Sequence, residues 1–182
     1  IKRYIDLNDI NTYANYVNSL GGNIRLEVGE QDSLTYIAAE KLFMRGDNEG
    51  ARRSFVNYLQ TYPEGAFSSN ANYYLGSIAF NQKEYDEAHQ RFASVITSGD
   101  TKFLEESVAR TAEIEYLNKD YATALESFKR LQIVAESPEN KQAARLGIMR
   151  SALETNQQQE ALLAAEELLK DPKLSPEIEA ES

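Results

Sequence analysis

The chain has 182 residues, of which 42% are hydrophobic and 26% are charged, and it contains no cysteine. This composition is typical of a folded domain or a short repeat array, and it excludes an intrinsically disordered chain. The formal net charge of −10 disfavours binding to nucleic acids and to anionic membrane surfaces, since both attract positively charged proteins.

The sequence shows no membrane-spanning or targeting segment. No apolar run approaches the ~18 residues that a transmembrane helix needs, and no basic stretch precedes an apolar one as in a signal peptide. The absence of cysteine leaves the redox compartment open. Residues 175–182 read as the start of another helix, so we expect the chain to be a fragment of a longer array.

The first 31 residues predict one helix and a connector. Thr12-Tyr-Ala-Asn-Tyr-Val matches Ser54-Phe-Val-Asn-Tyr-Leu position for position, so residues 6–20 are expected to form the second helix of an incomplete repeat. In the connector, Val28 and Gly29 belong to a short alternating pattern that predicts a small extended segment over 23–31.

From residue 32 onwards the chain repeats itself. Four alanines, here called the marker alanines, are separated by 37, 36 and 37 residues; they are Ala51, Ala88, Ala124 and Ala161. Each marker alanine is followed by mostly apolar residues four and seven positions later, which is the spacing of one helix face. Each is preceded by a polar turn and another apolar stretch. The pattern therefore predicts helix–turn–helix repeats, with helices over 32–45, 47–61, 67–81, 84–97, 102–117, 120–135, 139–155 and 158–170.

The residue types suit close helix packing. We expect each marker alanine to lie where the two helices of a repeat cross, because a larger side chain would push the helix axes apart. Gly46 and Gly50 bracket the first turn, and both are assigned to backbone geometry.

These residues resemble the tetratricopeptide repeat family, a two-helix solenoid with a period near 34 residues. The repeat that matches best carries Tyr74-Leu75-Gly76, Ala79-Phe80, Tyr85, Ala88 and Phe92. The resemblance implies an all-α, right-handed superhelix with about four repeats. The predicted organisation is a partial repeat with its connector (1–31), four repeats (32–66, 67–101, 102–137 and 138–174) and the start of a further helix (175–182).

The chain also departs from the family pattern. It has no tryptophan, its repeats are 36–37 residues long, and Met149 occupies the small-residue position of the fourth repeat. The string Glu30-Gln-Asp-Ser-Leu-Thr-Tyr-Ile-Ala-Ala-Glu-Lys resembles the long tetratricopeptide proteins of Gram-negative envelopes, Bacteroides-type ones especially. That resemblance implies a location in the periplasm or on the periplasmic face of the outer membrane.

Members of the family mostly bind other proteins in a groove lined by the first helix of each repeat. By resemblance, the candidate groove residues are Tyr36, Glu40, Phe43, Tyr73, Ser77, Phe80, Glu113, Tyr116 and Arg150, with Ala109, Leu146 and Leu153 beside them. The Lys, Asn and Arg with which many relatives hold a C-terminal carboxylate are absent, since the aligned positions are Tyr36, Glu40 and Tyr73.

Each candidate also has a structural explanation. The groove aromatics can pack between repeats instead of binding a partner. The acidic cluster of Glu105, Glu106, Glu113 and Glu115 can receive a basic partner or form a solvated face. Glu115 is expected to reach solvent or to pair with Arg110 or Lys119. His89, the single histidine, is expected to point outward.

The sequence favours a non-enzymatic scaffold that binds another protein or peptide segment, with a basic partner favoured by the net charge. It offers no fixed acid–base pair and no phosphate-binding glycine loop, so we expect no catalytic residue, cofactor or metal. Two alternatives stay open. One is an accessory or regulatory region of a larger enzyme or transporter, and the other is a helical repeat that binds a small molecule or glycan.

Overall fold

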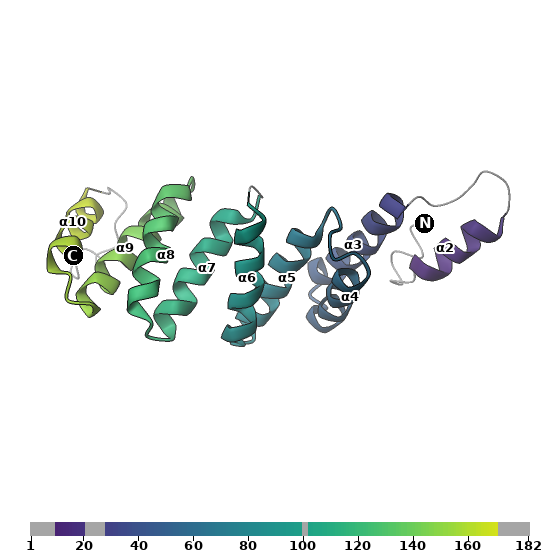
Figure 1. Ribbon diagram of the computed structural model, residues 1–182, viewed down its shortest axis with the longest axis horizontal. Coiled ribbons are helices and arrows are strands. Elements are labelled where there is room, and N and C mark those ends of the chain that lie inside the picture. Colours follow the sequence, from purple (N-terminus) through teal and green to yellow (C-terminus); the bar gives the residue numbers. More distant parts are fainter. Residues whose placement is uncertain (1–9, 21–27, 100–101, 171–182) are drawn as a thin grey trace. The chain divides into compact units, whose positions relative to one another are not determined.

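The structure, a computed structural model, describes residues 10–20, 28–99 and 102–170, and within these ranges every regular element is an α-helix (Figure 1). The chain divides into two compact units, residues 1–91 and 92–182, and the division falls inside one helix. The all-α helical-repeat fold predicted from the periodicity is confirmed.

The N-terminal unit contains α2 (Ile10–Ser19), α3 (Val28–Met44), α4 (Asn48–Thr61), α5 (Ser68–Asn81) and the first half of α6 (Tyr85–Ser98). The C-terminal unit contains the rest of α6, α7 (Leu104–Leu117), α8 (Tyr121–Val134), α9 (Pro138–Glu154) and α10 (Gln158–Leu169). Within each unit, helices that follow one another in the sequence pack side by side.

One sequence-based expectation was wrong. The extended segment predicted over 23–31 is helical from Val28, so α3 begins four residues before the predicted start at residue 32. The brief alternation of apolar residues was too short to outweigh the helical pattern that follows it. Residues 23–27 of that segment, the predicted helix residues 6–9 and the helix start at 175 lie outside the described residues.

The marker alanines have the predicted register. Ala51, Ala88 and Ala124 are fully buried, and Ala161 is 4% exposed. The residues four and seven positions later are buried as well, among them Phe55 with Tyr58 and Phe128 with Leu131. The 37-36-37 spacing of the marker alanines therefore marks a buried helix face in each repeat.

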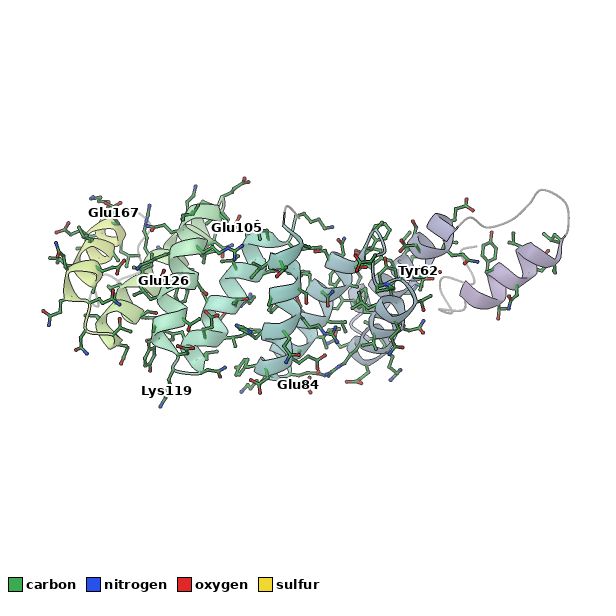
Figure 2. All side chains as sticks on the ribbon, viewed as in Figure 1. Tyr62, Glu84, Glu105, Lys119, Glu126 and Glu167 are labelled. Carbon is green, nitrogen blue, oxygen red and sulfur yellow. The ribbon has the colours of Figure 1, made fainter. Side chains whose placement is uncertain are left out.

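The turn inside each repeat contains one residue in the left-handed backbone region. The residue lies five positions before the marker alanine, and the four are Gly46 (φ 80°), Lys83 (φ 61°), Lys119 (φ 63°) and Asn156 (φ 60°). The next N–H donates back to a carbonyl in the last turn of the preceding helix, as from Asp120 to Glu115 at 2.9 Å. Figure 2 labels Lys119 at the turn between α7 and α8. This arrangement ends a helix with its last carbonyls satisfied.

The second helix of two repeats begins with an aspartate cap. The Asp47 carboxylate accepts a hydrogen bond from Gly50 N at 2.9 Å, and Asp120 accepts one from Thr123 N at 3.3 Å. Gly50 is helical, and a Cβ there would lie 2.3 Å from Asp47 Oδ2. Its role is therefore to leave room for the cap, which corrects the assignment of Gly50 to backbone geometry. Gly46 has the positive φ that its assignment requires.

We expect Lys119→Gly to raise the free energy of unfolding by about 0.5–1 kcal/mol. A left-handed backbone costs a non-glycine residue roughly 1–2 kcal/mol, and the greater freedom of glycine in the unfolded chain removes part of that gain. Gly46→Ala should lower stability by about 1 kcal/mol, because it introduces the same strain in the equivalent turn. Urea unfolding followed by circular dichroism measures both changes. A destabilised Lys119→Gly variant would show that the turn is not strained.

In both units an acidic side chain near the start of one helix holds the loop that leads into the helix two further along. In the N-terminal unit, the buried Asp32 of α3 accepts hydrogen bonds from Ala66 N (3.0 Å) and from the hydroxyl of Tyr58. In the C-terminal unit, Glu105 of α7 accepts from Glu136 N (3.0 Å) and Ser137 N (3.1 Å). We call these two carboxylates the loop clasps.

The clasp in the C-terminal unit has an unusually low pKa. Burial opposes ionisation of Glu105, but hydrogen bonds from Glu136 N, the Asn140 amide and Ser137 outweigh it and lower the pKa from 4.5 to about 2. A depressed folded-state pKa stabilises the fold above the ordinary pKa, and this stabilisation is lost as the pH falls from 4.5 towards 2.

We therefore expect Glu105→Gln to cost about 1–2 kcal/mol at pH 7, because the ionised acceptor is lost from a partly solvent-screened site. The difference from the unsubstituted protein should shrink as the pH is lowered from 4.5 to 2. Urea unfolding at several pH values tests this, with the exposed, non-clasp Glu136→Gln as the control. A difference that is unchanged at low pH would contradict the role of the ionised carboxylate.

Candidate functional site

The expected groove residues of the N-terminal unit pack against one another. Tyr36 of α3 is only 3% exposed, and its ring stacks on Phe67 with centroids 4.4 Å apart. Its hydroxyl donates to Glu40 Oε1 at 2.6 Å and accepts from the Asn70 amide at 3.3 Å. Tyr36 therefore packs against its neighbours within the unit, and its role in binding stays a prediction.

Glu40 is surrounded by tyrosine hydroxyls. Its Oε1 accepts from Tyr36 and also from Tyr74 of α5, at 3.0 Å. Burial, reinforced by the hydrogen bond to Glu40, raises the pKa of Tyr74 to about 12, and the same causes raise the pKa of Tyr36 well above its ordinary value. These tyrosines stay neutral at physiological pH. Their hydrogen bonds to Glu40 join α3 to α5.

The other four candidates of this unit also have partners within it. The Phe43 ring lies 4.8 Å from the ring of Tyr74, and the Tyr73 ring lies 5.5 Å from it. The Ser77 hydroxyl donates to the carbonyl of Tyr73, and Phe80 packs edge-on against Tyr85, which begins α6. Phe43, Tyr73, Ser77 and Phe80 are all half-buried, and their role in binding stays a prediction.

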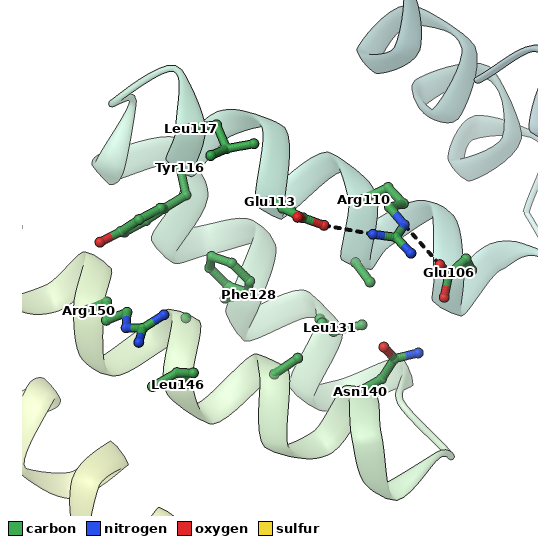
Figure 3. A pocket seen from close by; sticks show the side chains of 13 residues that line it. Glu106, Arg110, Glu113, Tyr116, Leu117, Phe128, Leu131, Asn140, Leu146 and Arg150 are labelled. Carbon is green, nitrogen blue, oxygen red and sulfur yellow. Dashed lines mark hydrogen bonds and ion pairs between the residues drawn. The ribbon is translucent and has the colours of Figure 1, made fainter. Parts of the chain in front are cut away.

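The C-terminal unit brings the remaining candidates together around a pocket of about 420 Å³ (Figure 3). Glu113 and Tyr116 reach it from α7, and Arg150 reaches it from α9. Ala109 and Leu146, which the resemblance places beside them, line it too, whereas Leu153 is 52% exposed elsewhere on α9. The volume is within the range of ligand-binding pockets.

Helical spacing explains which residues line the pocket. From α7 the lining residues are Glu106, Ala109, Arg110, Glu113, Tyr116 and Leu117, and from α9 they are Asn140, Ala143, Leu146, Gly147 and Arg150. On both helices they recur every three or four residues, so each set forms one helix face. Phe128 and Leu131 of α8 complete the lining.

The floor of the pocket depends on the absence of a side chain at Gly147. A Cβ there would lie 2.3–2.4 Å from three ring atoms of Phe128, so α9 approaches the aromatic ring as closely as glycine allows. Phe128 is 8% exposed and Leu131 is fully buried. The pocket therefore has a fixed apolar floor that belongs to the core of the unit.

The wall formed by α7 carries a cluster of charges. The Arg110 guanidinium bonds Glu106 Oε1 through Nε and Glu113 Oε2 through Nη1, each at 2.9 Å. Figure 3 shows this cluster near Asn140 at one end of the view, while Tyr116 and Arg150 lie at the other end. The ring of Tyr116 is held in place by Tyr121 at a centroid distance of 5.1 Å.

The four glutamates of the acidic cluster do not share one environment. Glu106 and Glu113 are partly exposed to solvent and pair with Arg110, whereas Glu105 holds a loop. Glu115 was expected to reach solvent or to pair with Arg110 or Lys119. The first alternative is wrong, because the residue is only 8% exposed, and the pairing stays a prediction. Ser107, Thr111 and Glu115 are four residues apart and all buried, so helix position outweighs residue type here.

The described residues contain no group of three or more His, Cys, Asp or Glu side chains that could hold a metal ion. His89 is half-buried on α6. Within the same part of the chain, none of the helices combines the length and apolar character needed to cross a membrane.

Sequence reasoning missed several lining residues. Arg110, Leu117 and Asn140 lie on the same helix faces as the predicted residues, so extending the three- and four-residue spacing along α7 and α9 would have identified them. Phe128 and Leu131 were assigned to the core. Their position beneath the pocket depends on how closely α9 approaches α8 at Gly147, which no pattern in the sequence indicates.

No protein-family model matches the chain, and no curated protein matches it. Solved structures do. The chain is similar to MamA (AMB-1), with 13% identity over 98% of this chain and 91% of MamA and a TM-score of 0.66. It is also similar to a kinesin light chain with TPR-like repeats from Podospora anserina, with 13% identity, coverage of 99% and 91% respectively, and a TM-score of 0.56.

The apo form of RapI is similar over part of its length. The identity is 20%, with coverage of 91% of this chain and 49% of RapI and a TM-score of 0.54. At these identities the likeness is one of fold, which is that of tetratricopeptide-type helical repeats.

Proposed function

We propose that this chain is a non-catalytic scaffold that binds a segment of another protein in the pocket formed by α7, α8 and α9. The pocket carries the proposal: it combines a fixed apolar floor with polar and charged walls, the usual composition of a recognition site. The fold supports it as well, because repeats of this kind present the residues of successive helices side by side.

The proposal can be tested with a displayed peptide library selected on the immobilised chain. Enriched peptides are synthesised, and their affinities are measured by fluorescence anisotropy. Tyr116→Ala and Leu146→Ala should each weaken binding at least tenfold, because both remove lining side chains. Ile133→Ala is the matched control, since Ile133 lies on α8 and is 83% exposed. Circular dichroism establishes that each variant is folded.

The proposal fails if no peptide is enriched, or if every enriched peptide binds the Tyr116 and Leu146 variants as tightly as the original chain. A pull-down from cell lysate with the tagged chain, followed by the same variants, extends the test to the native partner. Loss of a partner with both pocket variants, but not with Ile133→Ala, would support the scaffold role.

We further propose that the scaffold works in the periplasm or at the periplasmic face of the outer membrane. The resemblance of residues 30–41 to envelope tetratricopeptide proteins supports this location, and the lack of cysteine is compatible with an oxidising compartment. Fractionation of cells that produce the tagged full-length protein tests it. Recovery in the cytosolic fraction alone would contradict it.

A further inference from the structure

One end of the pocket has more negative than positive charge. Glu106 and Glu113 of α7 both line the pocket, and both pair with the single guanidinium of Arg110 at 2.9 Å (Figure 3). Two carboxylates therefore share one cation. The side chains of Glu106 and Glu113 are 35% and 46% exposed, so a bound segment can reach them.

Each of the two carboxylates has an oxygen that Arg110 does not use. Arg110 Nε bonds Glu106 Oε1 and Arg110 Nη1 bonds Glu113 Oε2, so Glu106 Oε2 and Glu113 Oε1 remain as acceptors. A carboxylate accepts about four hydrogen bonds through its two oxygens. A second cation can therefore be added without breaking the contacts with Arg110, and it would balance the charge of the cluster. The other arginine of the lining, Arg150, lies at the opposite end of the view in Figure 3.

Asn140 of α9 adds a third acceptor at the same end of the pocket (Figure 3). Its amide nitrogen donates to Glu105 Oε1 at 2.8 Å, so the loop clasp fixes how the amide is oriented. The amide oxygen is then the group that Asn140 can offer to a ligand. We call Glu106, Glu113 and Asn140 the acceptor end. A lysine ammonium, which has three N–H donors and no acceptor, matches it.

The rest of the pocket suits an apolar side chain. Ala109, Ala143 and Leu146 line it together with the floor residues Phe128 and Leu131, and none of these five side chains carries a polar atom. The pocket volume of about 420 Å³ leaves room for a large aliphatic or aromatic side chain. A ligand that combines such a side chain with a cation would therefore contact both parts.

The length of the pocket sets the spacing of these two groups in a ligand. Asn140 and Leu146 are six residues apart on α9, which corresponds to roughly 9 Å along the helix axis. An extended peptide advances about 3.3 Å per residue, so about two or three residues cover this separation.

We propose that the pocket binds a basic–hydrophobic segment, in which a large apolar side chain lies on the floor and a nearby lysine or arginine binds the acceptor end. This inference rests on the proposed function and names the chemistry of the bound segment. The segment also covers the two carboxylates, and their attraction to its cation strengthens as water is excluded. The net charge of −10 acts in the same direction, because it attracts a basic partner before contact.

The experiment starts from the tightest-binding peptide of the library selection, synthesised with both termini blocked so that they add no charge. We expect this peptide to contain a lysine or arginine two or three positions from a large apolar residue. Replacing that basic residue with glutamine should weaken binding to the intact chain about tenfold, because a charge-assisted contact is lost. A glutamate in its place should weaken binding further. Fluorescence anisotropy measures the three affinities.

Variants of the chain then locate the cation. Glu113→Gln should reduce the preference for the basic peptide over the glutamine peptide, and the double variant Glu106→Gln/Glu113→Gln should remove it. Glu126→Gln is the matched control, because Glu126 of α8 is exposed and pairs with a cation three residues away, as Glu113 does. It removes the same charge outside the pocket lining and should leave the preference unchanged. Circular dichroism establishes that each variant is folded.

The possible failures are distinct. If the three peptides bind equally, or the glutamate peptide binds most tightly, and all lose binding with Leu146→Ala, the pocket remains a peptide site but the basic preference is wrong. If Glu113→Gln and Glu126→Gln reduce the preference equally, the cation responds to the overall charge and the inference is overturned. If no peptide depends on Tyr116 or Leu146, the proposed function itself is wrong.

Discussion

Replacing Asp32 with alanine is expected to lower the free energy of unfolding by about 2–4 kcal/mol. The Asp32 carboxylate is 7% exposed and accepts hydrogen bonds from the hydroxyl of Tyr58 and from Ala66 N. Removal of the carboxylate takes this acceptor away from two donors at the junction of α4 and α5. Hydrogen bonds to a charged group contribute more to stability than hydrogen bonds between neutral groups. Tyr58 also accepts a hydrogen bond from Phe67 N at 3.0 Å, so the loss extends along the loop.

A double-mutant cycle separates this effect from simple loss of packing. Asp32→Ala, Tyr58→Phe and the double variant are compared by urea unfolding. If the hydroxyl acts through Asp32, the two changes together should cost at least 1 kcal/mol less than the sum of the single changes. Glu30→Ala, at an exposed position two residues away in α3, is the control and should lie within about 0.5 kcal/mol of the original chain. Strict additivity would show that Asp32 and Tyr58 contribute independently.

Replacing Gly147 with alanine is expected to destabilise the C-terminal unit by about 1–3 kcal/mol. In an ordinary helix interior the same change stabilises by roughly 1 kcal/mol, because alanine has the higher helix propensity. Here the added methyl group would lie 2.3–2.4 Å from the Phe128 ring, and the closely packed core has little room to adjust. Overpacking of this kind typically costs 1–3 kcal/mol.

A second variant identifies the cause. Phe128→Leu removes the ring that the methyl group would strike, so Gly147→Ala should be neutral or stabilising in that background. Thermal unfolding of the four proteins measures the coupling. Equal destabilisation in both backgrounds would contradict the contact with Phe128. Gly147→Ala in the intact background should also lower the affinity of any peptide that binds to the pocket floor.

The repeat register could be predicted because it depends on spacing. The 37-36-37 separation of the marker alanines required only helical periodicity, and the buried Phe55 and Leu131 follow from it. The start of α3 was harder to predict from the sequence. Its first residues, Val28 and Gly29, carry a weak alternating pattern, and the longer helix that includes them is visible only in the folded chain.

The candidate site was predictable where one helix face determined it. Glu113, Tyr116 and Arg150 follow from the position of first helices in repeats of this type, and the structure brings them around one pocket. Tyr36 occupies an equivalent face but is buried by the stacked ring of Phe67, which comes from the loop before α5. Whether a groove residue is exposed or covered depends on side chains from distant parts of the sequence. In this case Phe67 lies 31 residues after Tyr36.

The side-chain contacts between neighbouring repeats determine how the chain should respond to a pulling force. Arg52 pairs with Glu87, Glu105 binds Asn140, and Lys129 pairs with Glu160, so these links span 35, 35 and 31 residues. Each joins a helix to the following repeat, and none ties distant parts of the chain together. Under tension applied between residues 28 and 170, the clasps should therefore fail one after another. A single-molecule pulling experiment should therefore record several small increases in extension, and not one large increase.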